Sequence, residues 1–390
     1  MSTVETVPGA DEMSHDDHGH DHDHPSFLAH HFDTPEQQFD SGKLGIWLFL
    51  VTEVLFFSGM FCAYAIFRNL RPDVFEGCSQ FLNTKLGAIN TGVLLFSSLT
   101  MAWAVRCSQT EEHKKLTGML AATLSCAMIF LGVKSIEYSH KWGMGLLPAG
   151  MFSYDPAHPH GTGDHPNYLL YLCLPFAIAF VGTVIWLIVS FVKGNKFQLA
   201  CAKPLTVVAF SFFIGVGLGS ILESGESDAH AGEHSEAAAH EHVDGENHGT
   251  EMLAASAVED QELSVQERLA SDTTNTGLMS DVTARQRQAE LASGTALSDV
   301  SKVEGGISDV EGNVLTKRQA GVFFSIYYCM TGIHAIHILG GIAVLVWLLV
   351  RSVRQDFNRQ YFGPVDYVGL YWHLVDLIWI YLFPLLYLIR

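Results

Sequence analysis

Seven long apolar runs constrain the fold of this chain more than any other feature. They span residues 46–67, 86–105, 116–136, 168–192, 204–222, 321–350 and 368–389. Each is about as long as a helix needs to cross roughly 30 Å of hydrocarbon, where every backbone polar group must bond within its own segment. The sequence therefore predicts an all-α, polytopic membrane helix bundle with seven transmembrane helices and a long extramembrane insertion.

The expected insertion interrupts the apolar pattern between the fifth and sixth runs. Residues 223–318 hold 20 acidic and 6 basic residues, a net charge of −14 against −19 for the whole chain. Because aromatic residues are scarce there, we expect no packed core in this segment. The chain then divides into an acidic His-rich tail (1–42), three helices (43–140), an outer loop with two additional helices (141–222), the acidic insertion (223–318) and two last helices (319–390).

The distribution of lysine and arginine predicts how the helices are oriented. Three of the short loops are basic, through Arg106, Lys114 and Lys115, then Lys193, Lys196 and Lys203, then Arg351, Arg354 and Arg359. Basic short loops stay on the cytoplasmic side. We therefore expect a cytoplasmic N-terminus, an outer C-terminus and an outer insertion. Arg68, Arg71 and Lys85 depart from this pattern, because they fall on the outer side.

One carboxyl group lies well inside the first apolar run, at Glu53. Ionisable side chains within hydrocarbon are costly, so each needs a partner or a function. Glu53 can be a proton-exchanging or lipid-contacting acid, or a protonated side chain that hydrogen-bonds to a neighbouring helix. The sequence leaves both interpretations open.

Further ionisable residues recur at helical spacing in three other runs. Lys134, Glu137 and His140 lie three apart near the end of the third run, where we expect a structural ion pair rather than catalytic use. His334 and His337 share a face of the sixth run, and His373 and Asp376 share a face of the seventh. An imidazole oriented by a carboxylate is chemically usable, but this is also the simplest way to satisfy a buried histidine.

The histidine count limits what cofactors this chain can hold. A membrane redox core with two haems and a copper needs about six imidazoles, and only His334, His337 and His373 lie well inside the runs. We therefore expect no redox core and no metal site, although a single haem held by two histidines, as in a b-type haem anchor, stays open. The His-rich tracts at 15–24 and 230–248 can be solvated charged segments or can bind a divalent metal loosely, and the sequence leaves both open. A metal transporter would need more paired ligands deep in the membrane.

Five stretches together resemble a known family. They are residues 45–57 around Glu53, 90–98, 137–138, 331–341 with both histidines, and 371–379 with His373 and Asp376. These stretches are similar to the cytochrome c oxidase subunit III family, in the family's order, over positions 43–140 and 319–390.

The resemblance implies an accessory subunit of a haem-copper terminal oxidase in aerobic respiratory electron transport. Such a chain would belong to a proton-translocating enzyme without being catalytic itself. Haem and copper would lie in the partner subunits I and II, and this chain would carry bound phospholipid in a bacterial-type inner membrane. Quinol oxidases and some nitric oxide reductases use the same type of subunit, so the electron donor stays open. No nucleic-acid partner is expected.

The resemblance also assigns roles to individual residues. Glu53 matches the family's reactive intramembrane acid and is expected to be proton-related. The expected lipid-binding residues are His334, His337, Arg351, Arg354 and His373. Lys134, Glu137, His140 and Asp376 are expected to form structural polar pairs, and no catalytic or metal-binding residue is expected.

The chain departs from the longer members of the family in two ways. Two helices that precede the Glu-bearing one in those proteins have no counterpart here, whereas the spans at 168–192 and 204–222 are additional. We expect this pair to pack in the place of the absent helices and rebuild one wall of the lipid cleft. The acidic insertion would attract a basic cytochrome c, or else form a solvated linker.

Overall fold

The computed structural model describes residues 28–29, 32–154, 167–240, 307 and 315–388, and these residues form helices and no β-strand. The helices are α1 (Pro35–Leu70), α2 (Pro72–Ser79), α3 (Thr84–Gln109), α4 (His113–Gly143), α5 (Tyr168–Val192), α6 (Lys196–His240), α10 (Lys317–Val353) and α11 (Gly363–Phe383), which a π-helical turn at Pro384–Leu388 continues. All of them except α2 are long and apolar enough to cross a membrane. The expected all-α bundle with seven spans is thus confirmed, and the chain is a multi-pass membrane protein.

Several helices extend beyond the apolar runs that located them. The first begins at Pro35, where the Thr34 side chain accepts a hydrogen bond from the Gln37 amide. The sixth span begins at Lys317 behind a capping box made by Thr316 and Gln319. Hydropathy finds only the part of a helix that crosses hydrocarbon, whereas polar caps set its true end.

The extramembrane predictions fall largely outside the described residues. The backbone of α6 continues to His240, well into the expected insertion. The His-rich tract at 15–24 and the remaining parts of the insertion, 241–306 and 308–314, lie outside the described part of the chain.

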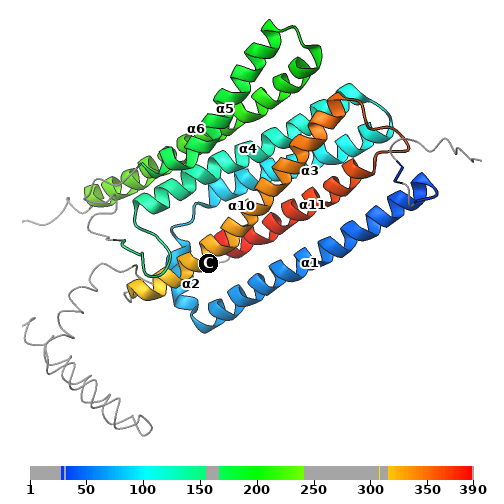
Figure 1. Cartoon of the computed structure of the whole chain (residues 1–390). Helices are drawn as coiled ribbons and strands as arrows, with labels where there is room; N and C mark the ends of the chain where they lie inside the picture. Colours follow the sequence, from blue (N-terminus) through cyan, green and yellow to red (C-terminus); the bar gives the residue numbers. More distant parts are fainter. Residues whose placement is uncertain (1–27, 30–31, 155–166, 241–306, 308–314, 389–390) are drawn as a thin grey trace, which may run out of the picture.

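The seven long helices form a bundle with a dense centre and two lateral additions (Figure 1). Helices α3, α4, α10 and α11 pack on one another, and the fully buried side chains of Phe130, Trp372 and Trp379 lie between them. On one side α1 lies along α11, and on the other side the α5–α6 hairpin packs on α4. The Glu-bearing helix and the additional pair are therefore on opposite sides of the bundle.

Glycines bring α4 and α6 into close contact. A Cβ atom added at Gly132 of α4 would overlap the backbone of α6 at Phe212, and one added at Gly215 would overlap the backbone of α4 at Ile129. Small residues allow membrane helices to approach this closely. This packing holds the additional pair on α4, across the bundle from α1. That the pair takes the place of the absent helices and rebuilds one wall of the lipid cleft stays a prediction.

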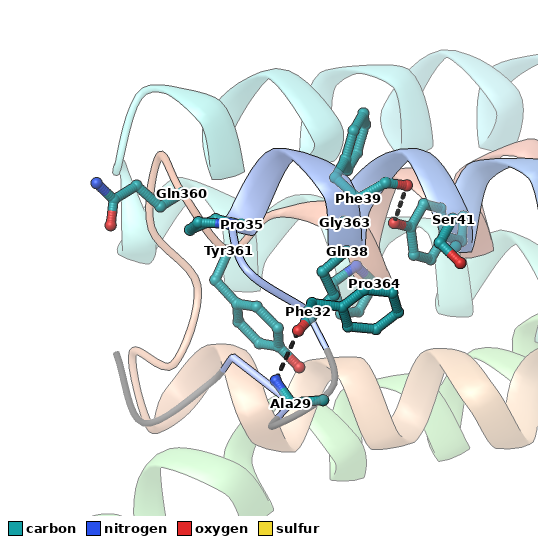
Figure 2. Close-up of a pocket in the computed structure, with 12 residues that line it drawn as sticks. Ala29, Phe32, Pro35, Gln38, Phe39, Ser41, Gln360, Tyr361, Gly363 and Pro364 are labelled. Atoms are coloured by element: carbon teal, nitrogen blue, oxygen red, sulfur yellow. Dashed lines mark hydrogen bonds between the residues drawn. The ribbon is translucent and has the colours of Figure 1, made fainter. Parts of the chain in front are cut away.

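Polar contacts at several heights along α1 fasten it to the bundle. Near its start, the Tyr367 hydroxyl of α11 donates to the Phe39 carbonyl over 2.8 Å. Ala29 N donates to Gln38 Oε1 over 2.8 Å, which ties the segment before α1 to its first turns (Figure 2). Midway, Glu53 meets His337, and near the end the Tyr64 hydroxyl donates to the Leu385 carbonyl. These point contacts matter because few α1 side chains are buried.

Candidate functional site

Glu53 of α1 and His337 of α10 form a hydrogen-bonded pair within the membrane-spanning part of the bundle. Glu53 Oε2 lies 2.9 Å from His337 Nε2, and His337 Nδ1 lies 2.8 Å from the Ile333 carbonyl oxygen. A carbonyl oxygen only accepts, so Nδ1 carries a hydrogen. The Glu53–His337 contact then holds one further proton, either on the carboxyl group or on Nε2, and the same geometry accommodates both states.

The surroundings of the Glu53–His337 pair enclose it only in part. The buried Phe57 ring meets the imidazole edge-on with 5.0 Å between centroids, and the Tyr371 hydroxyl donates to the His337 carbonyl over 3.0 Å. The side chains of Glu53 and His337 nevertheless remain 18% and 20% exposed. The pair is therefore held in place by its neighbours and still reaches the surface of the bundle.

His373 and Asp376 do not form the pair that their spacing suggested. His373 Nδ1 lies 2.6 Å from the Ser98 hydroxyl of α3, and the buried Asp376 carboxyl group lies beside the same serine. Both side chains project from α11 toward α3, where the hydroxyl is a closer partner for the imidazole. The histidine is thus oriented by serine.

His334 points away from His337, into the interior of the bundle. Its ring is fully buried, 5.8 Å from the Phe130 ring and 5.4 Å from the Trp379 ring, and its nitrogens have no hydrogen-bond partner among the described residues. A lipid does not reach this position, so we carry no lipid-binding role forward for His334. Residues three apart on a helix diverge by about 60°. This divergence is enough to direct His337 toward Glu53 and His334 into the interior of the bundle.

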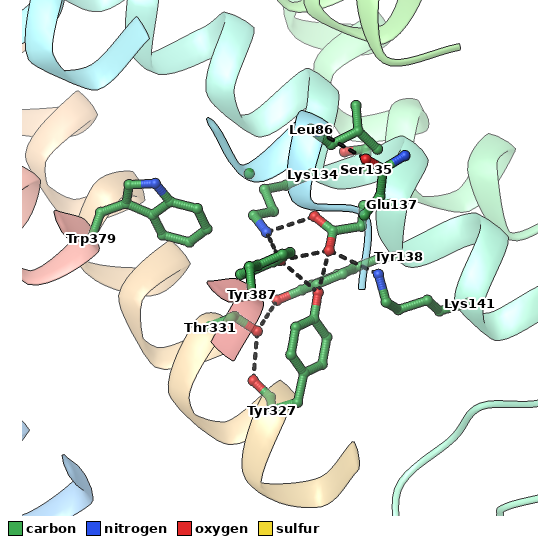
Figure 3. A network of polar contacts seen from close by, with 12 residues as sticks. Leu86, Lys134, Ser135, Glu137, Tyr138, Lys141, Tyr327, Thr331, Trp379 and Tyr387 are labelled. Carbon is green, nitrogen blue, oxygen red and sulfur yellow. Dashed lines mark hydrogen bonds and ion pairs between the residues drawn. The ribbon is translucent and has the colours of Figure 1, made fainter. Parts of the chain in front are cut away.

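A second polar group, the Lys–Glu–Tyr cluster, lies deep between α4, α10 and the end of the chain (Figure 3). It consists of Lys134, Glu137, Lys141, Tyr327 and Tyr387. Glu137 Oε2 accepts from Lys134 over 2.6 Å, while Oε1 accepts from Lys141 over 2.8 Å and from the Tyr327 and Tyr387 hydroxyls over 2.8 and 2.6 Å. The three charged side chains are at most 6% exposed.

The Lys–Glu–Tyr cluster brings two ammonium groups to one carboxylate. Aromatic rings offset part of the excess positive charge, because Lys134 Nζ lies 4.5 Å from the Trp379 ring and Lys141 Nζ lies 5.3 Å from the Tyr327 ring. Every donor is directed inward and the cluster joins three segments, an arrangement that holds helices together rather than one that binds a substrate. Sequence reasoning found Lys134 and Glu137 but missed Lys141, whose spacing of four from Glu137 was the available signal.

His140 faces a different helix from Glu137. Its Nδ1 lies 2.7 Å from Glu223 Oε1 of α6, with both side chains partly exposed. His140 therefore contributes to the attachment of the additional helix pair, while Glu137, one turn away, turns inward.

The two arginines expected to bind lipid lie at the end of the bundle opposite the Lys–Glu–Tyr cluster, and both already contact other side chains of this chain. Arg351 donates to Asp356 over 2.9 Å and to the Tyr361 hydroxyl over 3.2 Å. The Arg354 guanidinium lies 5.5 Å from the Phe197 ring of α6. Both guanidinium groups stay near the bundle surface, where a headgroup can still approach them. The described residues contain no cluster of three or more His, Cys, Asp or Glu side chains arranged to hold a metal ion.

Comparison with known proteins adds a second line of evidence. A family model described as cytochrome c oxidase subunit III matches residues 25–143 and 314–389, which is half of the chain. The matched segments contain both the Glu53–His337 pair and the Lys–Glu–Tyr cluster. They leave out residues 144–313, which include both α5 and α6.

Curated relatives match over a shorter stretch. The chain is 35% identical over 75 residues to a probable cytochrome c oxidase subunit 3 from Nocardia farcinica, covering 19% of this chain and 37% of the relative. It is 40% identical over 72 residues to cytochrome c oxidase subunit 3 from Thermostichus vulcanus, covering 18% and 36%. A haem-copper oxidase subunit I+III from Aeropyrum pernix is 38% identical over 71 residues, covering 18% of this chain and 9% of that protein.

The matched stretch thus spans little more than a third of the subunit 3 relatives, and no solved structure matches the chain. The family model is the broader finding, because it covers both the Glu-bearing helix and the two closing helices, in the order that the motifs predicted. The expected resemblance is confirmed, and the chain belongs to the cytochrome c oxidase subunit III family.

Proposed function

We propose that this chain is a non-redox accessory subunit of a haem-copper terminal oxidase, most simply a cytochrome c oxidase, and that it supports proton uptake and lasting activity of the catalytic subunit. Haem and copper would then reside in partner subunits. Family membership supports association with an oxidase. The observation that supports the finer proposal is the Glu53–His337 pair, a carboxyl–imidazole hydrogen bond of 2.9 Å whose side chains are partly exposed at the bundle surface.

The geometry of the pair supports a role in proton exchange beside the catalytic subunit. When the proton is on Glu53 the contact is neutral, and when it is on His337 the contact is an ion pair. Transfer between the two atoms crosses only the 2.9 Å of the hydrogen bond. Exposure at the bundle surface lets a water molecule reach the pair and supply or remove the proton.

The proposal is tested by Glu53→Gln in the assembled complex, with Glu36→Gln at the start of α1 as a control of equal charge change. We expect the initial rate of oxygen consumption to stay within about twofold, because no redox centre is touched, while protons pumped per electron or the number of turnovers before inactivation falls. The control should change neither quantity. Immediate and complete loss of oxygen consumption in an assembled complex would contradict an accessory role.

The identity of the complex requires a separate measurement. The chain would be purified in a gentle detergent, and the subunits and the reduced-minus-oxidised spectrum of the preparation recorded. Haem bands on a larger partner support the oxidase proposal and identify its type, including a quinol oxidase or a nitric oxide reductase. A haem on this chain alone would instead favour a b-type anchor.

A further inference from the structure

A cavity of about 360 Å³ opens at the end of the bundle opposite Arg351 and Arg354. It lies between the end of α1, the short helix α2 and the first turns of α10. Its lining consists of Phe67, Arg71, Val74, Phe75, Arg318, Gln319, Val322 and Phe323. Two arginines from distant parts of the sequence thus line one cavity together with apolar side chains.

The charge of this Arg71–Arg318 cavity has one sign. No carboxylate belongs to its lining, and the Gln319 amide oxygen is occupied by the backbone and hydroxyl of Thr316. Among the described residues neither arginine side chain forms an ion pair. Guanidinium groups match the geometry of phosphate oxygens, to which they can donate two parallel hydrogen bonds.

The position of the cavity along the helices indicates which kind of anionic ligand fits it. Arg71 directly follows the last residue of α1, and Arg318 is the second residue of α10, so both stand where a membrane span ends. Below them, Phe67 is 45% exposed and Val322 is 37% exposed. A cationic rim at the membrane boundary above an exposed apolar strip fits an amphipathic ligand with an anionic head.

We propose that the Arg71–Arg318 cavity binds the headgroup of an anionic phospholipid, with its phosphate between the two guanidinium groups and an acyl chain along Phe67 and Val322. The site also accounts for a departure from the expected charge pattern, since arginines on this side oppose the orientation that the other loops indicate. A binding role gives them a reason to be present that helix orientation does not.

The test compares lipid retention by the full-length chain purified in detergent and incubated with phosphatidylglycerol or phosphatidylcholine, then analysed by native mass spectrometry. We expect the wild type to retain phosphatidylglycerol in preference, and Arg71→Gln/Arg318→Gln to lower that retention roughly 25-fold, since two basic residues are removed and each one near a membrane surface contributes about a fivefold preference for anionic lipid. Lys85→Gln/Lys317→Gln is the matched control, because it removes the same charge at the same end from residues outside the cavity lining.

Two further arms keep the proposal falsifiable. Val322→Asn changes no charge and should also lower retention, which decides the matter if the arginine variant fails to fold. An excess of inorganic phosphate should not displace the lipid. Equal retention by the arginine variant and its control, equal retention of phosphatidylcholine, or displacement by phosphate alone would each overturn the proposal; the last would indicate a site for free anions.

Discussion

Glu137→Gln should be among the most destabilising single changes in this protein, because it leaves two buried lysines without a counter-charge. The side chain is nearly isosteric and keeps an acceptor oxygen, so the change removes charge without creating a cavity. In the native protein Glu137 lies 2.6 Å from Lys134 Nζ and 2.8 Å from Lys141 Nζ, with all three side chains buried (Figure 3). Breaking a buried ion pair by removing one partner costs about 3–5 kcal/mol.

A cost of this size would consume a large part of a typical stability of about 5–15 kcal/mol. The matched control is Glu112→Gln at the N-cap of the same helix, where the carboxylate pairs with Lys115 at 3.0 Å with the same spacing of three, but with side chains 43% and 62% exposed. Exposed pairs contribute about 0–1 kcal/mol. The comparison therefore isolates burial from spacing and residue type.

The assay is thermal unfolding in detergent micelles, followed by loss of monodisperse protein, together with unfolding in increasing SDS. We expect Glu137→Gln to lower the midpoint strongly and Glu112→Gln to leave it nearly unchanged. The triple variant Lys134→Met/Glu137→Leu/Lys141→Met should recover part of the loss, because it removes the stranded charges as well. Equal midpoints for Glu137→Gln and Glu112→Gln would refute the view that the cluster is a buried structural clamp.

Three more outcomes follow from the structure and the sequence. Gly132→Val should detach α6 from α4 or destabilise the bundle by about 1–3 kcal/mol, because its side chain would overlap the α6 backbone, and an unchanged melting midpoint would contradict the packing described. Burial raises the pKa of the Cys78 thiol to about 12, so the reactive thiolate is scarce until the pH approaches that value. Maleimide labelling of Cys78 at pH 8 should be far slower in the folded chain than in SDS, and equal rates would show that the thiol is accessible. If the insertion steers a basic cytochrome c, deleting residues 241–306, with 13 acidic and 4 basic residues, should raise KM for that cytochrome at low ionic strength, whereas an unchanged KM would favour a solvated linker.

The membrane fold could be predicted because it depends on local composition, while its polar contacts could not. Apolar runs located all seven spans, since each must cross the membrane whatever its neighbours are. The partner of Glu53, by contrast, lies 284 positions away on α10, and only tertiary packing selects His337 over the adjacent imidazole of His334. Spacing along one helix likewise suggested that His373 pairs with Asp376, whereas its actual partner is on a neighbouring helix.

The Lys–Glu–Tyr cluster shows the same limit. Lys134 and Glu137 are close in sequence, so their pairing could be anticipated, but Tyr327 and Tyr387 reach Glu137 from α10 and from the last turn of the chain. The sequence also could not predict on which side of the bundle the additional helices α5 and α6 pack. It depends on the backbone contact that Gly132 and Gly215 permit, and glycines are too common in membrane helices to identify their partners from sequence.

The two buried polar groups differ in a way that bears on function. The Lys–Glu–Tyr cluster is enclosed in the dense centre, with every oxygen of Glu137 bonded, so a change in its protonation would strand charges and disturb three segments together. The Glu53–His337 pair joins the bundle to α1, a helix that buries few of its own side chains. Its two proton positions preserve the same contact, so it can change state without loosening the core. If one of these groups exchanges protons during turnover, the structural argument selects the Glu53–His337 pair, and the contrasting effects of Glu53→Gln on pumping and Glu137→Gln on stability would distinguish the two roles.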